Sequence, residues 1–262
     1  MRIGLVPVSA KPLHKGHYML IELAAKSNDE VAVFISYSSR GTKSVKDPTD
    51  ARPISKGGRK IDVPVEGDTP VFGSDMKYIW SNLLTPENLK FSSNVKIFSP
   101  DMSGVGPAPV MNVYKVCGAF AESYNAKEKT FDVPFLDIAV DTASTIINIY
   151  SDVEDIAAYD NENSMPKYGG GLWKGVGSGN KAPCIQGIGV SRTDTVDISG
   201  TKMRQMLKDG DVEGFIKLLP PVSDKIAREI FKILSQSAIE GVPLEKRIQT
   251  EALIRQYVRS IL

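Results

Sequence analysis

The chain has 262 residues, of which 42% are hydrophobic and 24% are charged, and its formal net charge is +1. These values are ordinary for a globular protein and allow one large α/β domain, alone or with appended segments. Because the charge is balanced, we expect no nucleic-acid partner and no membrane partner, and any phosphate recognition must be local. The N-terminal apolar run is too short for a secretory signal, and no stretch reaches the roughly 18 apolar residues of a spanning helix.

The first elements predict a βαβ unit. Residues 2–8 are apolar throughout, as buried parallel strands are, and residues 17–27 carry apolar side chains at helical spacing. A second apolar run at 31–37 predicts the next buried strand. A strand, a helix and a strand of these lengths imply parallel pairing with a right-handed crossover. The expected fold class is α/β, with a Rossmann-like parallel sheet, flanking helices and a helical C-terminal segment.

The turn between the first strand and the first helix holds both histidines of the chain, His14 and His17, with Gly16 between them. The first N–H groups of a helix have no internal partner and lie at the positive end of the helix dipole, so this turn favours anions. We interpret it as a site for the phosphates of a nucleoside triphosphate. The alternative is that the imidazoles cap the turn. A zinc site is not expected, because no third histidine exists and neither cysteine lies in a ligand pattern.

Residues 38–73 break the pattern with a long polar stretch that is rich in Gly and Pro. Its cations, beginning with Arg40, suggest either a mobile basic flap over a phosphorylated substrate or a solvated surface loop. Residues 74–84 then predict a helix with Ser74 as its N-cap. A strand is expected at 95–98, an amphipathic helix at 111–124 and a further strand at 145–150.

Two features after the last of these strands are candidates for substrate contact. Asp152 follows the strand at its carboxyl end, where ligands of open parallel sheets bind, although it is equally suited to cap the next helix. Residues 160–184 are dense in glycine around Trp173. We interpret them as a flexible loop in which Trp173 or Tyr168 stacks on a base, or as a structural turn cluster. Cys117 and Cys184 form no disulfide framework, which favours a cytoplasmic, reducing setting.

The second motif runs from Ile198 to Arg204 with the sequence I-S-G-T-K-M-R. Ser199 or Thr201 can cap a helix that begins near Lys202, and the free N–H groups of such a helix start bind phosphate. Arg204 lies one turn further on, and its guanidinium suits the charge on phosphoryl oxygens. The alternative is an ordinary capped helix with a solvent-facing arginine.

Residues 211–219, 223–235 and 244–261 predict three C-terminal helices with apolar faces. These faces either cover the sheet or form a contact between copies in a homo-oligomer. The expected organisation is a domain over residues 1–210, with insertions near 38–73 and 160–184. Residues 211–262 are expected to pack on or beside it.

Together the two motifs resemble those of the HIGH superfamily of nucleotidylyltransferases, over roughly residues 1–210. The second is similar to forms in nicotinamide-mononucleotide adenylyltransferases and in phage-encoded cytidylyltransferase-like proteins. The resemblance implies transfer of a nucleoside monophosphate from an NTP, with ATP expected and CTP as the alternative, to a small phosphorylated acceptor. Pyrophosphate is released, and Mg²⁺ is the implied cofactor.

The resemblance also implies roles for individual residues. His14 and His17 would contact the triphosphate and stabilise the pentavalent transition state, with Arg204 as the third catalytic group. The implied phosphate-binding residues are Ser9, Lys11, Gly16, Ser199, Gly200 and Thr201. Lys11 stands where many members have Asp or Gln, which motivates a further alternative, a silent binding or assembly protein that keeps the fold. All of these interpretations require both motifs to serve one polyphosphate.

Overall fold

The computed structural model describes residues 1–9, 12–191 and 198–261, with side chains up to residue 256. The chain forms two compact units, each built from several segments. Unit 1 contains residues 1–10, 14–36 and 90–198, and unit 2 contains residues 11–13, 37–89 and 199–262. The boundary expected near residue 210 stays a prediction.

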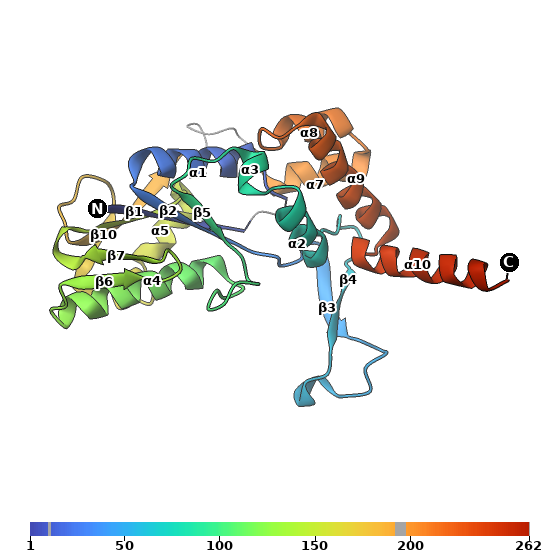
Figure 1. Ribbon diagram of the computed structural model, residues 1–262, viewed down its shortest axis with the longest axis horizontal. Helices are drawn as coiled ribbons and strands as arrows, with labels where there is room; N and C mark the ends of the chain where they lie inside the picture. Colours follow the sequence, from blue (N-terminus) through green and yellow to red (C-terminus); the bar gives the residue numbers. More distant parts are fainter. Residues whose placement is uncertain (10–11, 192–197, 262) are drawn as a thin grey trace. The chain divides into compact units, whose positions relative to one another are not determined.

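Unit 1 is built on a parallel sheet of six strands, counted in the described part of the chain (Figure 1). In order across the sheet the strands are β5 (Val95–Phe98), β2 (Glu30–Ile35), β1 (Arg2–Val8), β8 (Ile146–Asp152), β10 (Cys184–Val190) and β9 (Trp173–Val176). The predicted βαβ unit is confirmed, since β1 and β2 pair in parallel with Gly4 opposite Val31. The α/β, Rossmann-like class is therefore confirmed.

The order of the strands reverses at β1. The chain goes from β1 through α1 (Lys15–Ser27) to β2 on one side, and β8 pairs with β1 on the other. Such a reversal is the point at which open α/β sheets bind ligands, in the crevice outside the carboxyl ends of the strands. For this chain that edge carries the end of β1, which leads to the histidines, and the end of β8 at Asp152.

Two helices cover opposite faces of the sheet (Figure 1). On one face, α4 (Pro109–Asn125) packs Val113, Val116 and Phe120 into a core that includes Ile3 and Leu5 of β1. On the other, α1 packs against β1, β2 and β8 and ends near Gly4, whose added Cβ would lie 3.0 Å from Asn28 Nδ2. Adjacent β1 residues thus face different helices, as the alternation of a strand requires.

A buried ladder of amide side chains links α1 to two strands of the sheet. Asn148 Nδ2 of β8 donates to Asn28 Oδ1 (2.7 Å), and Gln186 Nε2 of β10 donates to Asn148 Oδ1 (2.7 Å). Asn28 Nδ2 in turn donates to the hydroxyl of Tyr150 (2.9 Å), and Asn180 donates to Gln186 Oε1 (2.8 Å). These partners satisfy polar groups that would otherwise be costly to bury.

The interpretation of residues 160–184 as a loop is wrong in part. They contain the short helix α6 (Met165–Tyr168) and the edge strand β9, which pairs in parallel with β10. Only residues 177–183 connect β9 to β10, whereas parallel neighbours usually need a crossover of a dozen residues or more. A pattern search that expects a helix between parallel strands therefore passes over this pair.

Other elements of unit 1 are smaller. β6 (Thr130–Val133) and β7 (Ile138–Asp141) form a hairpin that the sequence analysis did not anticipate. The short helix α5 (Val153–Ala157) directly follows β8. Cys117 and Cys184 are both buried and form no disulfide.

Unit 2 contains a two-stranded antiparallel ribbon and the remaining helices. The ribbon pairs β3 (Thr42–Lys46) with β4 (Lys60–Pro64), which corrects the expectation that 38–73 lacks regular structure. The helices are α2 (Gly73–Asn82), α3 (Pro86–Leu89), α7 (Gly200–Asp209), α8 (Val212–Leu218), α9 (Asp224–Glu240) and α10 (Leu244–Ile261). The N-cap of α2 is Phe72 rather than the predicted Ser74, because the helix begins one residue before that serine.

The C-terminal helices form where they were predicted. Within unit 2, the apolar face of α9 packs against α7, α8 and α2. α10 is joined to α2 by the N–H of Leu244, which donates to the buried carboxylate of Asp75 (2.8 Å). Among the described residues, no helix is long and apolar enough to cross a membrane.

Candidate functional site

The two histidines stack on each other at the start of α1. β1 ends at Val8, and α1 begins at Lys15 with His14 in the N-cap position. The imidazole rings of His14 and His17 lie 3.9 Å apart, centroid to centroid, at an interplanar angle of 24°. The His14 side chain makes no capping hydrogen bond, and no acidic residue lies in the first turn. His14 therefore does not cap α1 through its side chain, and the first turn of α1 contains no carboxylate.

His17 lies at the start of α1 and has a buried ring nitrogen with no partner in the part of the chain that the structure describes. Burial, and then the neighbouring charge of His14, hold the pKa of His17 well below its ordinary value of 6.5. Its Nδ1 is buried and has no hydrogen-bond partner among the described residues. A buried polar atom without a partner costs free energy in the absence of a ligand. At neutral pH this imidazole is uncharged and has unused hydrogen-bonding capacity at the end of a helix that attracts anions.

Three other predicted residues of unit 1, Ser9, Gly16 and Asp152, also lie at or after the carboxyl ends of β1 and β8. Ser9 directly follows β1 and is exposed, and Gly16 lies in the first turn of α1. Asp152 Oδ1 accepts the N–H of Asp155 (2.8 Å), so it caps α5 as the alternative interpretation held. Its contact with substrate stays a prediction. Lys11 lies outside the described residues.

The aromatic side chains of residues 160–184 have partners inside unit 1. Trp173 begins β9, and its indole Nε1 donates to Asp160 Oδ1 (3.0 Å). The ring of Tyr168 stacks on that of Tyr114, with centroids 4.6 Å apart at 7°. These contacts give both residues a structural role, and stacking of Trp173 on a base stays a prediction.

The second motif forms a capped helix start in unit 2. Ser199 is the N-cap of α7, and its hydroxyl accepts the N–H of Lys202 (3.2 Å). Of the two capping residues that the sequence allowed, the structure therefore uses Ser199. Gly200 opens the helix, and Arg204 Nη2 donates to Thr201 Oγ1 (3.1 Å), so the guanidinium is held against the first turn. Arg204 thus lies at the positive end of α7, where an anion would meet both charges.

Arg40 acts electrostatically on Arg204 within unit 2. Burial lowers the pKa of Arg204, the charge of Arg40 lowers it further, and Asp68 opposes the shift. Arg40 is fixed by backbone hydrogen bonds to Val71 in both directions (2.8 and 2.9 Å). Two guanidinium groups that repel each other beside a helix N-terminus are stabilised by an anion. The sequence indicated Arg40 only as part of a flap, since nothing local pairs it with a residue 164 positions away.

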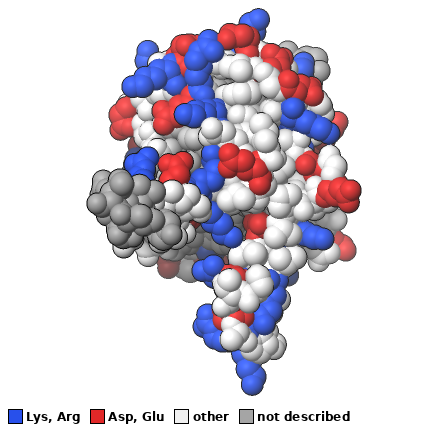
Figure 2. Space-filling view, turned by 90° about the vertical axis from the view of Figure 1, so that its right-hand side faces the viewer, with Lys and Arg blue, Asp and Glu red and all other residues white. Residues whose placement is uncertain are grey.

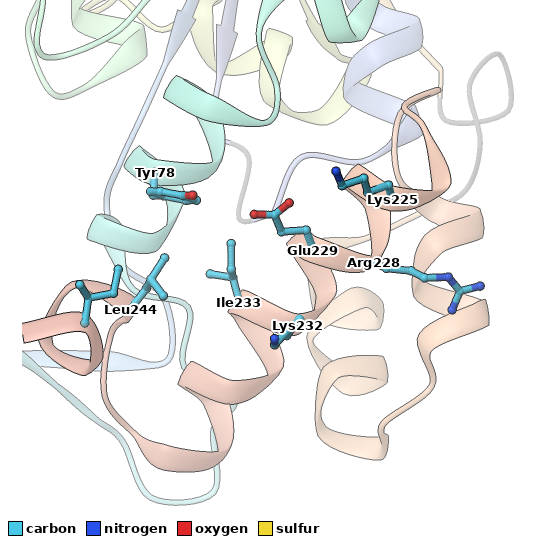
Figure 3. A pocket seen from close by; sticks show the side chains of 8 residues that line it. Tyr78, Lys225, Arg228, Glu229, Lys232, Ile233 and Leu244 are labelled. Atoms are coloured by element: carbon cyan, nitrogen blue, oxygen red, sulfur yellow. The ribbon is translucent and has the colours of Figure 1, made fainter. Parts of the chain in front are cut away.

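A separate open pocket of about 470 Å³ lies in unit 2 between α2, α9 and α10 (Figure 3). Tyr78, Glu229 and Leu244 contribute to its lining, and Figure 3 shows Glu229 directed toward the Tyr78 side. Its arginine, Arg228, is engaged by Asp224 and Glu213, at 2.8 Å each. None of the predicted site residues lines this pocket, and we assign it no function.

Comparisons with known proteins add little. No family model matches the chain, and no curated protein matches it. One similar solved structure is described as Thermotoga maritima TmcAL bound with alpha-thio ATP (Form II), with 13% identity and a TM-score of 0.30. The match covers 91% of this chain and 57% of that one, so this chain spans little more than half its length. A likeness this weak carries no argument, and the functional conclusion rests on the residues described above.

Proposed function

We propose that the protein is a nucleotidylyltransferase that transfers a nucleoside monophosphate from an NTP to a small phosphorylated acceptor and releases pyrophosphate. One observation carries the proposal: two stacked imidazoles at the start of α1, beside the strand at which the sheet order reverses. ATP is the first candidate NTP, because the second motif resembles that of adenylyltransferases. CTP is the alternative within the same chemistry.

In this proposal the imidazoles bind the triphosphate. Since the pKa of His17 is lowered, the free protein offers a neutral ring, and a polyanion would favour its protonation. Each ring would donate a hydrogen bond to phosphoryl oxygens, together with the open N–H groups of the first turn of α1. Negative charge shifts toward the leaving pyrophosphate during transfer, so donors held there lower the barrier.

In this proposal the residues of α7 have the phosphate-binding roles that the resemblance implies. Ser199 and Thr201 would hold β- and γ-phosphate oxygens, and Arg204 would neutralise the charge of the leaving pyrophosphate. Arg40 is a further candidate for the triphosphate or the acceptor phosphate, because it already shares the electrostatic environment of Arg204. No general base is needed if the acceptor is itself a phosphate, since such a nucleophile is ionised at neutral pH.

Mg²⁺ fits this site as an ion carried mainly by the substrate. Among the described residues, no group of three or more His, Cys, Asp or Glu side chains could hold a metal ion. Mg²⁺ in phosphoryl-transfer sites keeps several waters and binds phosphate oxygens with one or two carboxylates, and Asp152, at the end of β8, is a candidate for one of them. When bound, the ion would neutralise charge on the triphosphate.

The test is pyrophosphate release with Mg²⁺, each of the four NTPs and a panel of phosphorylated acceptors that includes nicotinamide mononucleotide. We expect release with one NTP and one acceptor, and a loss of about 10²–10³-fold in kcat for His17→Ala, as for removal of a single transition-state donor. Lys225→Ala, an exposed change in unit 2, is the control and should retain activity. Absence of release for every pair refutes the transfer, and NTP binding without turnover favours a silent binding protein.

A further inference from the structure

The ribbon of unit 2 carries more positive charge than the rest of the chain. Residues 42–64 contain six Lys and Arg side chains and three carboxylates, whereas the whole protein has a net charge of +1. The cations are Lys43, Lys46, Arg52, Lys56, Arg59 and Lys60. β3 and β4 extend away from α2 (Figure 1), and Figure 2 shows blue side chains along this ribbon.

Two of the three carboxylates lie beneath the cations that they bind. Asp50 contacts Arg52 at 2.8 Å, with the two side chains 14% and 67% exposed. Asp47 contacts Arg59 at 2.5 Å, and the Asp47 side chain is 3% exposed whereas that of Arg59 is 65% exposed. Asp47 also accepts from the N–H and hydroxyl of Thr49. The two carboxylates are therefore the more buried partners in these ion pairs, and the two guanidinium groups are the more exposed partners.

The lysines of the ribbon have no such partners. Lys43, Lys46, Lys56 and Lys60 are all exposed. No ion pair joins any of them to a carboxylate within the described ranges, and Asp62, the third acid, accepts from the hydroxyl of Ser39 instead. Among the described residues these lysines are therefore not paired with a carboxylate, and strand alternation places Lys46 and Lys60 on one face of the ribbon and Lys43 on the other.

The register places two of these lysines directly opposite each other. Lys46 of β3 pairs with Lys60 of β4, so both side chains lie on one face with Cβ atoms about 5 Å apart. Like charges directly opposite are destabilising in antiparallel pairs. A phosphate group between the two ammonium groups would remove this repulsion.

We propose that the ribbon of residues 42–64 binds the phosphodiester backbone of a nucleic acid without reading its sequence. A two-stranded ribbon is narrow enough to lie along a groove, and its exposed lysines, with Lys46 and Lys60 side by side on one face, can neutralise phosphates. The balanced charge of the whole chain predicted no nucleic-acid partner, but that argument averages over a surface on which this ribbon is locally basic. The proposal is independent of the nucleotidylyl-transfer proposal.

Fluorescence anisotropy with labelled oligonucleotides of about 30 nucleotides, as single-stranded RNA and as duplex DNA, tests it at about 50 and 200 mM KCl. We expect wild-type protein to bind at least one of them, with affinity that falls steeply as salt rises. Lys46→Ala/Lys60→Ala should weaken binding at least tenfold at low salt. It should also reduce the slope of log K against log salt by about 1.4 for single strands or about 1.8 for a duplex.

The matched control is Lys225→Ala/Lys232→Ala, which removes the same charge from exposed positions of α9 and should change the slope little. Thermal unfolding should show that both double variants remain folded. The proposal is overturned if wild-type protein binds neither oligonucleotide at low salt, or if both double variants weaken binding equally. Binding to phosphatidylserine vesicles without binding to oligonucleotides would also overturn it, in favour of a membrane surface.

Discussion

Replacing Asn148 by leucine removes the central member of the buried amide ladder at nearly constant volume. Asn148 donates to Asn28 and accepts from Gln186, both at 2.7 Å, and all three side chains are buried. The variant leaves the Oδ1 of Asn28 and the Nε2 of Gln186 without these partners, at about 1–3 kcal/mol each. Burial of the leucine offsets part of this cost, so we expect a net destabilisation of about 2–4 kcal/mol.

The two tryptophans allow this change to be measured in one unit at a time. Trp173 belongs to unit 1 and Trp80 to unit 2, so a Trp80→Phe background leaves fluorescence that reports on unit 1. Urea unfolding in that background should show a lower midpoint for Asn148→Leu. Asn180→Ala, at the half-buried end of the ladder, should cost less than about 1 kcal/mol because water replaces its contact. An Asn148→Leu protein as stable as its parent would refute the role we assign to the ladder.

Three further predictions concern the histidines, the α7 cap and a close backbone contact. Because the pKa of His17 is lowered in the folded state, the unfolded chain binds more protons below about pH 6.5, and stability should fall as the pH drops through that range. His17→Asn should flatten the decline in unfolding free energy between about pH 7.5 and 5, and an unchanged decline would contradict the assignment. Ser199→Ala should destabilise unit 2 by about 1 kcal/mol in Trp80 fluorescence, and Ser199→Gly by only a few tenths; equal stability would show that the cap is not used. Gly73→Ala places a Cβ 2.0 Å from the carbonyl oxygen of Tyr37 and should cost at least about 2 kcal/mol, whereas Gly171→Ala meets nothing within 4 Å and should be neutral.

The sequence was informative where one periodic pattern decided the structure. β1, α1, β2 and β5 form where their apolar spacing places them, and the helix predicted near Lys202 begins at Gly200 with a serine cap. Local signals suffice in these segments because a buried parallel strand is apolar throughout and a capped helix start has its own residue pattern.

Long-range contacts account for what the sequence did not reveal. β3 is mostly polar and exposed and lacks the apolar alternation of a typical strand, whereas Lys60 to Val63 of β4 alternate in a run of only four residues, which is a weak signal without its partner strand. β9 follows a run of glycines and is a strand only because β10 pairs with it. Arg40 acts on Arg204 and Asn28 bonds Asn148 and Tyr150 across more than 100 residues, which no local pattern encodes.

The affinity for Mg²⁺–ATP analogues tests the central claim most directly. Calorimetry with a non-cleavable α,β-methylene analogue should give a saturable Kd for the wild-type protein. His17→Ala and Arg204→Ala should each raise that Kd by about 10–100-fold, as for loss of a hydrogen bond to a charged group. Lys225→Ala should leave it unchanged. If the wild-type protein shows no saturable binding, or if either of the two site variants binds as tightly as wild type, the two motifs do not serve one triphosphate.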